Sequence, residues 1–489
     1  MTNYRLQDHL DGFDLHPLLR IGGSLVEAET ADRIDVLDPA TEQPIGTVPD
    51  AAVSDCIAAV DAADAAASSW AATGPRLRAE ILRGAFERMI ADAERLAHLI
   101  SLENGKTLAD ARAEVLYAAE FFRWYSEEAV RAIGEFSTAP SGGTNILVQF
   151  MPVGVCLLVT PWNFPAAMAT RKLGAALAAG CTCVLKPAVE TPLTAYALAD
   201  ILSDAGLPPG VINVVTTSKS PLTVGAMMAD TRVRKLSFTG STQVGRSLAK
   251  AAAERIVKCS LELGGNAPFI VLENADLDLA IEGAMIAKMR NGGQACTAAN
   301  RFLVHRSLTE AFGERLALRM GALRMGKGTD PDADVGPMVS QKARAGIAEA
   351  VALGLAEGGT LLSGGVAPDR PGYFYAPTVI ANLPSSSKLL DQEIFGPVAP
   401  ITAFEDEDEA IALANNSESG LASYVYARDL GRAMRVASKI EAGMVAVNRG
   451  IVSEPAAPFG GVKQSGIGRE GGHRGMLDYM ELKYMAVSW

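Results

Sequence analysis

The sequence predicts an α/β protein of more than one domain, and three features lead to this prediction. The chain has 489 residues, which is longer than a single hydrophobic core usually supports. Its residues are 49% apolar and 20% charged, as in ordinary globular proteins. Between Val155 and Glu273, short runs rich in Val and Leu alternate with stretches long enough for helices. That alternation is typical of βαβ units around a buried parallel sheet.

Helices are predicted for the region before this alternation. The alanine-rich run AAVDAADAAASSWAA has high helix propensity. From Ile81 to Ile100, apolar residues recur at steps of four and three, which places them on one face of a single helix. The pair Asn104-Gly105 is expected to end that helix.

Six apolar runs are predicted to form the strands of the first sheet: VCLLVT, TCVLKP, VINVVT, RKLSF, VKCSLEL and PFIVLE. A second alternating region extends from about Asn300 to Ala446, and its acidic segment EDEDEA reads as a solvated turn that enters a helix. The segments NILVQF (145–150) and LKYMAV (482–487) fit neither core and resemble half-buried strands. Their edges either pair within the chain or are covered by another chain.

Composition excludes several classes of partner. The net charge of −12 argues against binding to nucleic acid or to an anionic membrane, because either partner needs a dense basic surface. The N-terminus lacks a basic segment followed by an apolar one, and no stretch of 18 apolar residues occurs, so a cytoplasmic protein is predicted. The six cysteines show no C-x-x-C pairing, and we predict neither a disulfide framework nor a metal site.

Cys296 is the first candidate for chemistry. It lies in NGGQACTAAN, where small neighbours leave the backbone open to a substrate. A cysteine in a chain of this kind is more often a small buried apolar residue than a nucleophile. The chain has five histidines and none lies in an obvious catalytic motif, so a Cys-His hydrolase is possible but unsupported.

Two further residues could act beside a thiol. Glu262, in LELGG, lies at the end of an apolar run and could be a general base, although a strand-end salt bridge would also explain it. Asn163, in VTPWNFP, could donate an amide hydrogen bond to an oxyanion, or it could simply cap a loop.

A phosphate-binding turn is indicated by FTGSTQVG, which follows a predicted strand and opens a helix. Gly240, Ser241 and Gly245 would let backbone amides and a helix N-terminus face a phosphate, although the segment is not G-x-G-x-x-G. Lys186, in LKPAVETP, lies at another strand end, where an ammonium could meet ribose hydroxyls or phosphate.

Taken together, TPWNFP, LKPAVETP, FTGSTQVG, LELGG, GGQACT, EIFGP and PFGGVKQSGIGRE resemble the aldehyde dehydrogenase superfamily, in this order and from about Leu25 onward. The resemblance implies a Rossmann-like cofactor domain, an α/β catalytic domain and a small element that builds dimers or tetramers. The implied boundaries are 1–130 and 153–264 for the cofactor domain, 265–464 for the catalytic domain, and 131–152 and 465–489 for the bridging element. NILVQF and the C-terminal strand match the bridging element.

The resemblance also implies roles for individual residues. Cys296 would be the nucleophile, Glu262 the base that activates water, and Asn163 the oxyanion donor, with a thiohemiacetal and a thioester as intermediates. Lys172 and Glu470 match a suspected proton-relay pair, which a structural ion pair would equally explain. Residues implied to bind the dinucleotide are Thr160, Pro161, Trp162, Lys186, Val189, Gly240, Ser241, Gly245, Leu263, Glu393 and Phe395.

One departure from the family pattern concerns the cofactor. Many NAD-using members carry a glutamate three residues after the lysine equivalent to Lys186, where it accepts from ribose hydroxyls and repels a 2′-phosphate. Here that position is Val189, and the glutamate is displaced to Glu190. Use of NADP, or of both cofactors, is therefore expected. A Glu190 side chain that turned toward the ribose would restore a preference for NAD.

The expected substrate is a short aldehyde with a distant carboxylate. Arg171, Arg290 and Ser453 resemble the substrate-carboxylate residues of succinate-semialdehyde dehydrogenases, and a guanidinium can fork onto a carboxylate. Succinate semialdehyde is the first choice, with glutarate semialdehyde as the near competitor. Aromatic or aliphatic aldehydes, and a non-catalytic scaffold with this fold, are the alternatives. Ala298 lies where some relatives carry a second cysteine, so no redox switch is predicted at Cys296.

Overall fold

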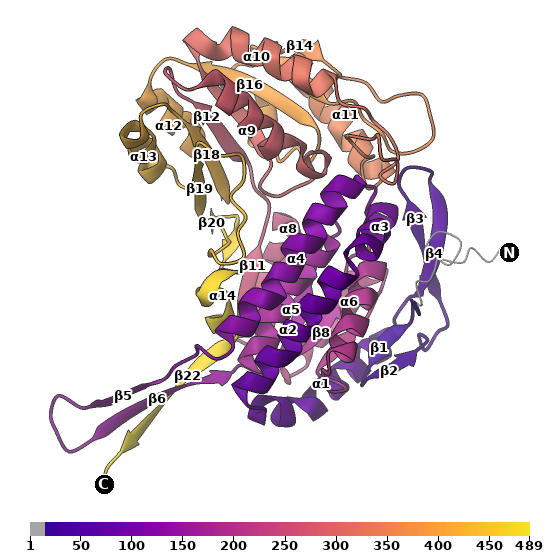
Figure 1. The fold of residues 1–489 in the computed structure, drawn as a ribbon, viewed down its shortest axis with the longest axis vertical. Coiled ribbons are helices and arrows are strands. Elements are labelled where there is room, and N and C mark those ends of the chain that lie inside the picture. The colour runs from indigo at the N-terminus through magenta and orange to yellow at the C-terminus, as the bar shows by residue number, and fades with distance from the viewer. Residues whose placement is uncertain (1–14) are drawn as a thin grey trace.

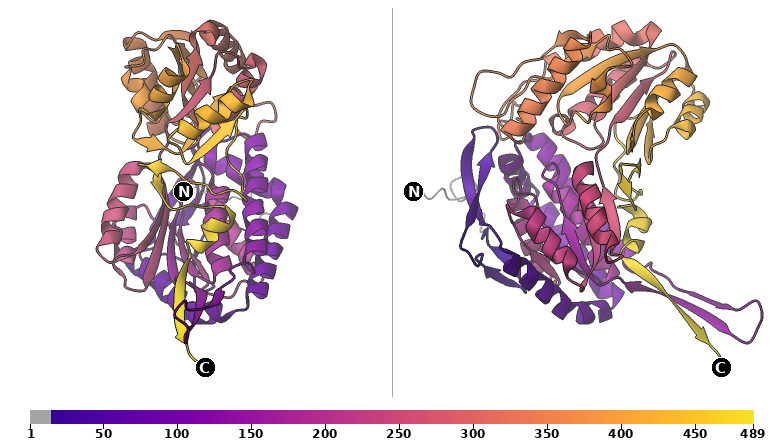
Figure 2. Two further views of the ribbon diagram at one scale, coloured as in Figure 1. Left: turned by 90° about the vertical axis from the view of Figure 1, so that its left-hand side faces the viewer. Right: turned by 180° about the vertical axis from the view of Figure 1, so that it is seen from behind.

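The computed structural model describes residues 15–489, and two large sheets dominate it (Figure 1). The predicted cofactor segment 1–130 and the prediction about the N-terminal leader both include residues 1–14, which lie outside the described part. The two sheets occupy separate halves of the molecule, and a narrow arm of strands projects from one half (Figure 2).

The first sheet has eight strands in the order β2-β1-β9-β8-β7-β10-β11-β21. Its five central strands are parallel, and β2, β1 and β21 extend it with antiparallel pairings. The strands are β1 (Leu19–Ile21), β2 (Ser24–Val26), β7 (Val155–Val159), β8 (Thr182–Lys186), β9 (Ile212–Val214), β10 (Val233–Thr239), β11 (Lys258–Glu262) and β21 (Gly466–Ile467).

Helices cover both faces of this sheet, which explains why its strands read as continuous apolar runs. Leu158 of β7 packs into a core with helices of the face seen in Figure 1, whereas Leu157 packs into a second core on the opposite face. The helices of this half are α1 (Val53–Ala72), α2 (Pro75–Ala91), α3 (Ala93–Asn104), α4 (Leu108–Glu128), α5 (Pro165–Ala179), α6 (Leu193–Asp204), α7 (Ser220–Ala229), α8 (Thr242–Ala253) and α14 (Gly472–Leu477).

The prediction of a single helix from Ile81 to Ile100 was wrong, because the segment is divided between two helices. The segment forms two helices, α2 and α3, which meet at Asp92 with φ −97° and ψ 13°. The apolar spacing continues through this break because both helices present buried residues to the same core. Gly105 ends α3 in the left-handed region, as its position after Asn104 predicted. The alanine-rich run forms α1 as predicted.

The second sheet has seven strands in the order β14-β15-β16-β13-β12-β18-β19, all parallel except for the β14–β15 pair. The run PFIVLE, predicted for the first sheet, forms β12 at the centre of this second sheet instead. The turn at Gly264 and Gly265 carries the chain from β11 across to the other half, and periodicity alone cannot detect such a change of sheet.

The strands of this half are β12 (Ala267–Val271), β13 (Ala299–His305), β14 (Thr360–Ser363), β15 (Thr378–Ala381), β16 (Val398–Phe404), β18 (Ala422–Tyr426) and β19 (Met444–Val447). Its helices are α9 (Leu277–Met289), α10 (Arg306–Gly321), α11 (Gln341–Ala356), α12 (Glu407–Asn415) and α13 (Leu430–Lys439), with short 3₁₀ helices η2 (Arg290–Gly293) and η3 (Lys388–Asp391). The segment EDEDEA enters α12 as predicted, and the Asp406 side chain caps it by accepting from Glu409 N.

The projecting arm is a three-stranded antiparallel sheet of β5 (Glu135–Thr138), β6 (Asn145–Pro152) and β22 (Met480–Val487) in the order β22-β6-β5. NILVQF and LKYMAV thus pair with each other, and Figure 1 shows the arm extending away from both large sheets. Two small antiparallel pairs complete the fold: β3 (Arg33–Asp38) with β4 (Gln43–Pro49), and β17 (Ser419–Gly420) with β20 (Val462–Lys463). No helix of the described chain is long and apolar enough to cross a membrane.

Candidate active site

The site is built where strands of the first sheet end. The loop from Thr160 to Asn163 follows β7, Gly240 follows β10, and Glu262 is the last residue of β11. These strands are parallel, so their carboxyl ends meet at one edge of the sheet, where open α/β sheets bind ligands. Gly240 N donates to the Glu262 carbonyl oxygen at 3.1 Å, which ties two of these ends together.

Cys296 reaches this edge from the other half of the molecule, on the loop that precedes β13. The loop turns through the left-handed region at Asn291, Gly292 and Gly293. A side chain at Gly293 would place its Cβ 2.2 Å from the carbonyl oxygen of Gly396, so only glycine fits there. Asn291 Nδ2 then donates to the backbone oxygen of Asn163 at 2.8 Å, which fastens the cysteine loop to the loop after β7.

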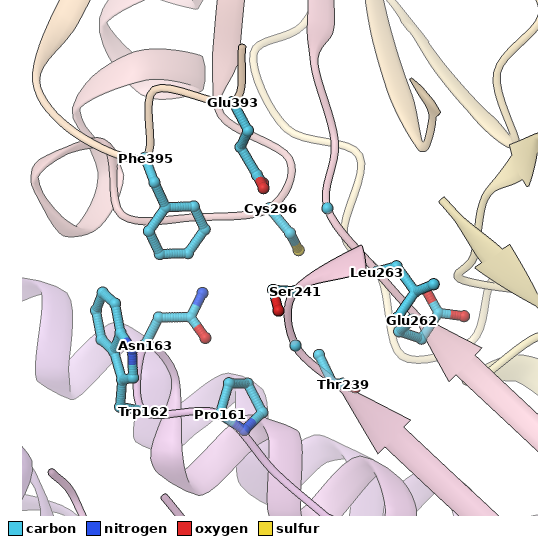
Figure 3. Close-up of a pocket in the computed structure, with 12 residues that line it drawn as sticks. Pro161, Trp162, Asn163, Thr239, Ser241, Glu262, Leu263, Cys296, Glu393 and Phe395 are labelled. Atoms are coloured by element: carbon cyan, nitrogen blue, oxygen red, sulfur yellow. The ribbon is translucent and has the colours of Figure 1, made fainter. Parts of the chain in front are cut away.

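A cavity of about 210 Å³ brings the predicted catalytic residues together. In Figure 3 the Cys296 thiol points into it, between the Asn163 amide and the side on which Glu262 lies. Asn163 Nδ2 donates one hydrogen bond to the Gln294 carbonyl oxygen at 3.1 Å, which orients the amide and leaves its second N–H for another acceptor. The lining residues are Pro161, Trp162, Asn163, Thr239, Gly240, Ser241, Glu262, Leu263, Gly264, Cys296, Glu393 and Phe395.

The environment of Cys296 keeps its thiol protonated. Burial raises the pKa of Cys296 to about 12, and the carboxyl groups of Glu393 and Glu262 add to the rise. The guanidinium groups of Arg171 and Arg290 act in the opposite direction. A thiol in this state needs a proton acceptor before it becomes a nucleophile, because the thiolate is the reactive form.

Glu262 and Glu393 are the two carboxyl groups that line the cavity, and Glu262 is the predicted acceptor. Both of its carboxyl oxygens are buried, and neither has a hydrogen-bond partner within residues 15–489. Burial and then the charge of Glu470 raise the pKa of Glu262 well above its usual range, against the opposing pull of Arg171 and Lys172. A carboxyl group with a raised pKa is a stronger base once ionised, as general-base catalysis near neutral pH requires.

The predicted relay pair is an ion pair in the interior. Lys172 Nζ contacts Glu470 Oε1, and both groups hydrogen-bond the Ser237 hydroxyl at 3.0 Å. Burial would raise the pKa of Glu470, but Lys172 and Arg171 lower it below its usual range. The pair therefore fits a structural role as well as a role in proton transfer.

The residues present fit a bound dinucleotide on the other side of the cavity. Gly245, near the start of α8, lies so close to Leu263 that a Cβ would approach its Cδ2 to 2.3 Å, so only glycine fits at this position. Ser241 caps that helix by accepting from Val244 N at 3.4 Å. The rings of Trp162 and Phe395 meet edge to face with their centres 5.4 Å apart and line one side of the cavity (Figure 3).

Two of the residues predicted to bind the cofactor, Glu393 and Lys186, are ionisable. Glu393 Oε1 accepts from Gly265 N at 3.1 Å, and burial raises the pKa of Glu393 to about 7. Lys186 ends β8 and is buried, which lowers its pKa, while Glu190 opposes the shift. Val189 and Glu190 are both half-exposed next to it. Thr160 N donates to the Lys186 carbonyl oxygen at 3.2 Å, so these two strand ends are adjacent.

The predicted substrate arginines differ in their surroundings. Arg171 is buried on α5, where its Nη1 lies 3.7 Å from Glu470 Oε2 and its Cζ lies 4.0 Å from the centre of the Phe459 ring. Arg290 is half-buried and stacks 4.6 Å above Phe164, without a hydrogen bond or ion pair to any residue between 15 and 489. Ser453 lies half-exposed in the loop after β19, and within the same described range it hydrogen-bonds neither arginine.

Several residues of the site carry no signal in the sequence. Lys106 donates to the backbone oxygen of Asn163 at 2.7 Å and to Glu114 Oε2 at 2.5 Å, and Glu114 in turn accepts from Ala166 N in the first turn of α5. Tyr117, on α4, accepts a hydrogen bond from Arg171 Nη2 at 3.1 Å. Both contacts join segments distant in the chain, and only the LENGKT stretch around Lys106, with its buried glycine turn, stands out as a pattern.

The fold and this site define the class of protein. The sequence profile of the aldehyde dehydrogenase family matches residues 25–485, and the chain belongs to that family. It is an NAD(P)-dependent aldehyde dehydrogenase.

Several named proteins are similar to this chain over most of its length. A succinate-semialdehyde dehydrogenase of Paenarthrobacter nicotinovorans is 55% identical over 91% of this chain and 99% of its own length. A glutarate-semialdehyde dehydrogenase of Pseudomonas putida is 46% identical over 96% of this chain and 97% of its own. The crystal structure of an Escherichia coli NADP-dependent enzyme, 45% identical, superposes with a TM-score of 0.96 over 98% of this chain and all of that one.

Proposed function

We propose that the chain oxidises succinate semialdehyde to succinate, with NADP as the favoured acceptor and NAD as the alternative. The observation that carries this proposal is Arg290, a guanidinium stacked on Phe164 whose charge acts on Cys296 and on buried Asp110 but which forms no ion pair or hydrogen bond with the described chain. A cation left unpaired beside a reactive thiol fits a substrate that supplies the missing carboxylate. The names of the relatives described above support the same class of substrate.

In the proposed reaction, Glu262 takes the proton of Cys296 and the thiolate adds to the aldehyde carbon. The resulting oxyanion accepts hydrogen bonds from Asn163 Nδ2 and from the backbone N–H of Cys296. A bound nicotinamide cofactor would supply the hydride acceptor for this adduct, which would become a thioester on Cys296. Lys172 and Glu470 would first carry the proton of Glu262 onward, so that its carboxylate is ionised again. Glu262 then deprotonates a water molecule, which attacks the thioester and releases the acid, and the departing Cys296 thiolate takes that proton back from Glu262.

For the cofactor, Lys186 would meet the adenosine ribose and its phosphate, while Glu393 and Phe395 would hold the nicotinamide end. Val189 supports NADP because it places no carboxylate three residues after Lys186. Thr160, Pro161, Trp162, Gly240, Ser241, Gly245 and Leu263 would form the remainder of the cofactor site.

The arrangement of the whole chain is part of the proposal. Residues up to 130 and 153–264 would bind the cofactor, 265–464 would carry the nucleophile, and 131–152 with 465–489 would bridge two copies in a homodimer or homotetramer in the cytoplasm. Apolar side chains exposed on the arm support such an assembly, with Phe136 60%, Leu482 64% and Tyr484 59% exposed. Light scattering coupled to gel filtration would test it, and a monomer would contradict it.

Initial rates with succinate semialdehyde, glutarate semialdehyde and benzaldehyde, each with NAD and NADP, test the proposed activity. The proposal expects kcat/KM to be highest for succinate semialdehyde with NADP. Glutarate semialdehyde is the closest competitor, because one methylene is worth only about 1–3 kcal/mol in a pocket. Comparable rates on benzaldehyde would refute recognition of the carboxylate, and no reduction of either cofactor with any aldehyde would favour a non-catalytic scaffold.

A further inference from the structure

Tyr117 stands between the two arginines proposed to bind the substrate. It belongs to α4, which packs against α5, and its side chain is half-buried. Its ring centre lies 6.0 Å from Arg171 Cζ and 5.6 Å from Arg290 Cζ, although the two arginines come from different halves of the molecule. Phe121, one turn along α4, fixes the ring from the side with an edge-to-face contact at 5.0 Å.

Tyr117 and Arg171 have hydrogen-bond donors that lack acceptors. The Tyr117 hydroxyl accepts from Arg171 Nη2 at 3.1 Å, and a guanidinium has no acceptor, so the phenolic proton must go elsewhere. Within residues 15–489 that proton has no acceptor. Arg171 Nε and Nη1 are also buried without a hydrogen bond, and Nη1 has only the ion pair with Glu470 at 3.7 Å.

An anion would satisfy this arrangement. The Tyr117 ring lies within 6.0 Å of both guanidinium carbons, and the phenolic proton, Arg171 Nε and Nη1, and the Arg290 donors all lack a hydrogen-bond acceptor within residues 15–489. The same two guanidinium groups lower the pKa of Cys296 against the effect of burial, so they lie close to the reacting thiol. A carboxylate has lone pairs for about four hydrogen bonds and could meet all three groups at once.

We propose that Tyr117 is a specificity-determining residue whose hydroxyl, held by Arg171, donates a hydrogen bond to the distal carboxylate of the substrate. The inference rests on the proposed oxidation of a carboxylated aldehyde and adds a third contact to it. A site built to donate such a bond discriminates strongly against an aldehyde that lacks the acceptor, because its buried donors then stay unpaired.

Tyr117→Phe tests this role, since it removes only the hydroxyl and keeps the ring beside Arg290 and Phe121. With succinate semialdehyde, we expect KM to rise about tenfold or more with kcat nearly unchanged. With butyraldehyde, which has the same carbon chain and no carboxylate, KM and kcat should stay as in the wild type. The inhibition constant of succinate should rise in parallel with KM, which gives a readout independent of turnover.

Tyr196→Phe is the matched control, because it removes a buried hydroxyl that bonds Thr216 at 2.8 Å in the cofactor half, away from the cavity. It should leave both KM values unchanged. Equal KM values of Tyr117→Phe and wild type for succinate semialdehyde would overturn the inference, and so would an equal loss on both aldehydes.

A double-mutant cycle separates direct contact from support of Arg171. If the hydroxyl touches the substrate, Tyr117→Phe should still raise KM for succinate semialdehyde in an Arg171→Gln background. If it acts only by holding Arg171, the effect should vanish there, which would overturn direct contact. A wild-type enzyme that does not prefer succinate semialdehyde over butyraldehyde would refute the proposed function itself, and that result is distinct from a failure of Tyr117 alone.

Discussion

Replacing Arg290 with glutamine gives the cleanest test of carboxylate recognition. Its guanidinium lies 4.6 Å from the centre of the Phe164 ring and has no hydrogen bond or ion pair to the described chain, so its removal leaves no buried group without a partner. Arg171 is a poorer choice, because its loss would also release Glu470 from a contact at 3.7 Å. The effect of Arg290→Gln should therefore fall on the substrate.

The expected magnitude follows from a single charged hydrogen bond, which is worth about 1.5–3 kcal/mol. At about 1.4 kcal/mol per factor of ten, kcat/KM for succinate semialdehyde should fall about 10- to 150-fold. For butyraldehyde the fall in kcat/KM should be several-fold smaller, because that aldehyde loses only the effect of the Arg290 charge, which lowers the pKa of Cys296, and no contact to a carboxylate.

Steady-state kinetics on both aldehydes with saturating NADP provide the assay. Arg319→Gln is the control. Arg319, on α10, forms an exposed ion pair with Glu282 of α9, and its substitution removes the same charge. An equal loss on both aldehydes would refute the reasoning and would give Arg290 a packing role beside Phe164. Unchanged kinetics on both would assign the recognition of the carboxylate to other groups.

Three further predictions concern the cofactor and the base. Gly245→Ala should destabilise the protein by about 1–3 kcal/mol in urea unfolding and raise KM for NADP, because the new Cβ meets Leu263 at 2.3 Å; a stable variant with unchanged KM would contradict this. Glu470→Gln should lower the pKa of Glu262, since it removes a repelling charge and leaves Arg171 and Lys172 unshared. Activity that requires ionised Glu262 should then persist to lower pH, and an acid limb of the kcat profile that moves to higher pH would be inconsistent with that sign. Val189→Glu should lower kcat/KM for NADP at least about tenfold while sparing NAD, and an unaltered cofactor ratio would show that this position does not select the phosphate.

The sequence predicted the layers of the fold because buried parallel strands and helices leave strong periodic signals. Prediction from the sequence failed at the assignment of one strand to a sheet and at a break between two helices. The run PFIVLE has the same pattern in either sheet, and only the crossing after Gly265 decides where it pairs. The break at Asp92 keeps the apolar stripe intact, so spacing could not reveal it.

The residues of the site likewise differ in whether they could be predicted from the sequence. Residues in short motifs, such as Cys296, Glu262 and Gly240, could be found in advance because glycine turns and strand ends mark them. Tyr117 could not be found in advance, because it is one aromatic residue on an amphipathic helix. Its proposed role depends on contacts with two arginines that lie 54 and 173 positions away in the sequence. The structure brings the predicted catalytic residues into one cavity, while their roles await the experiments above.

The central claim is that the sulfur of Cys296 carries the acyl group and that Glu262 directs its hydrolysis. Glu262→Gln mixed rapidly with succinate semialdehyde and NADP should reduce close to one equivalent of cofactor per site, more slowly than the wild type because Cys296 loses its proton without this base, and then turn over far more slowly still because hydrolysis of the thioester also lacks its base. Mass spectrometry of the quenched protein should then find a succinyl group on the peptide that contains Cys296. A variant that turns over at the wild-type rate without a burst, or that leaves Cys296 unmodified while the cofactor is reduced, would contradict the account.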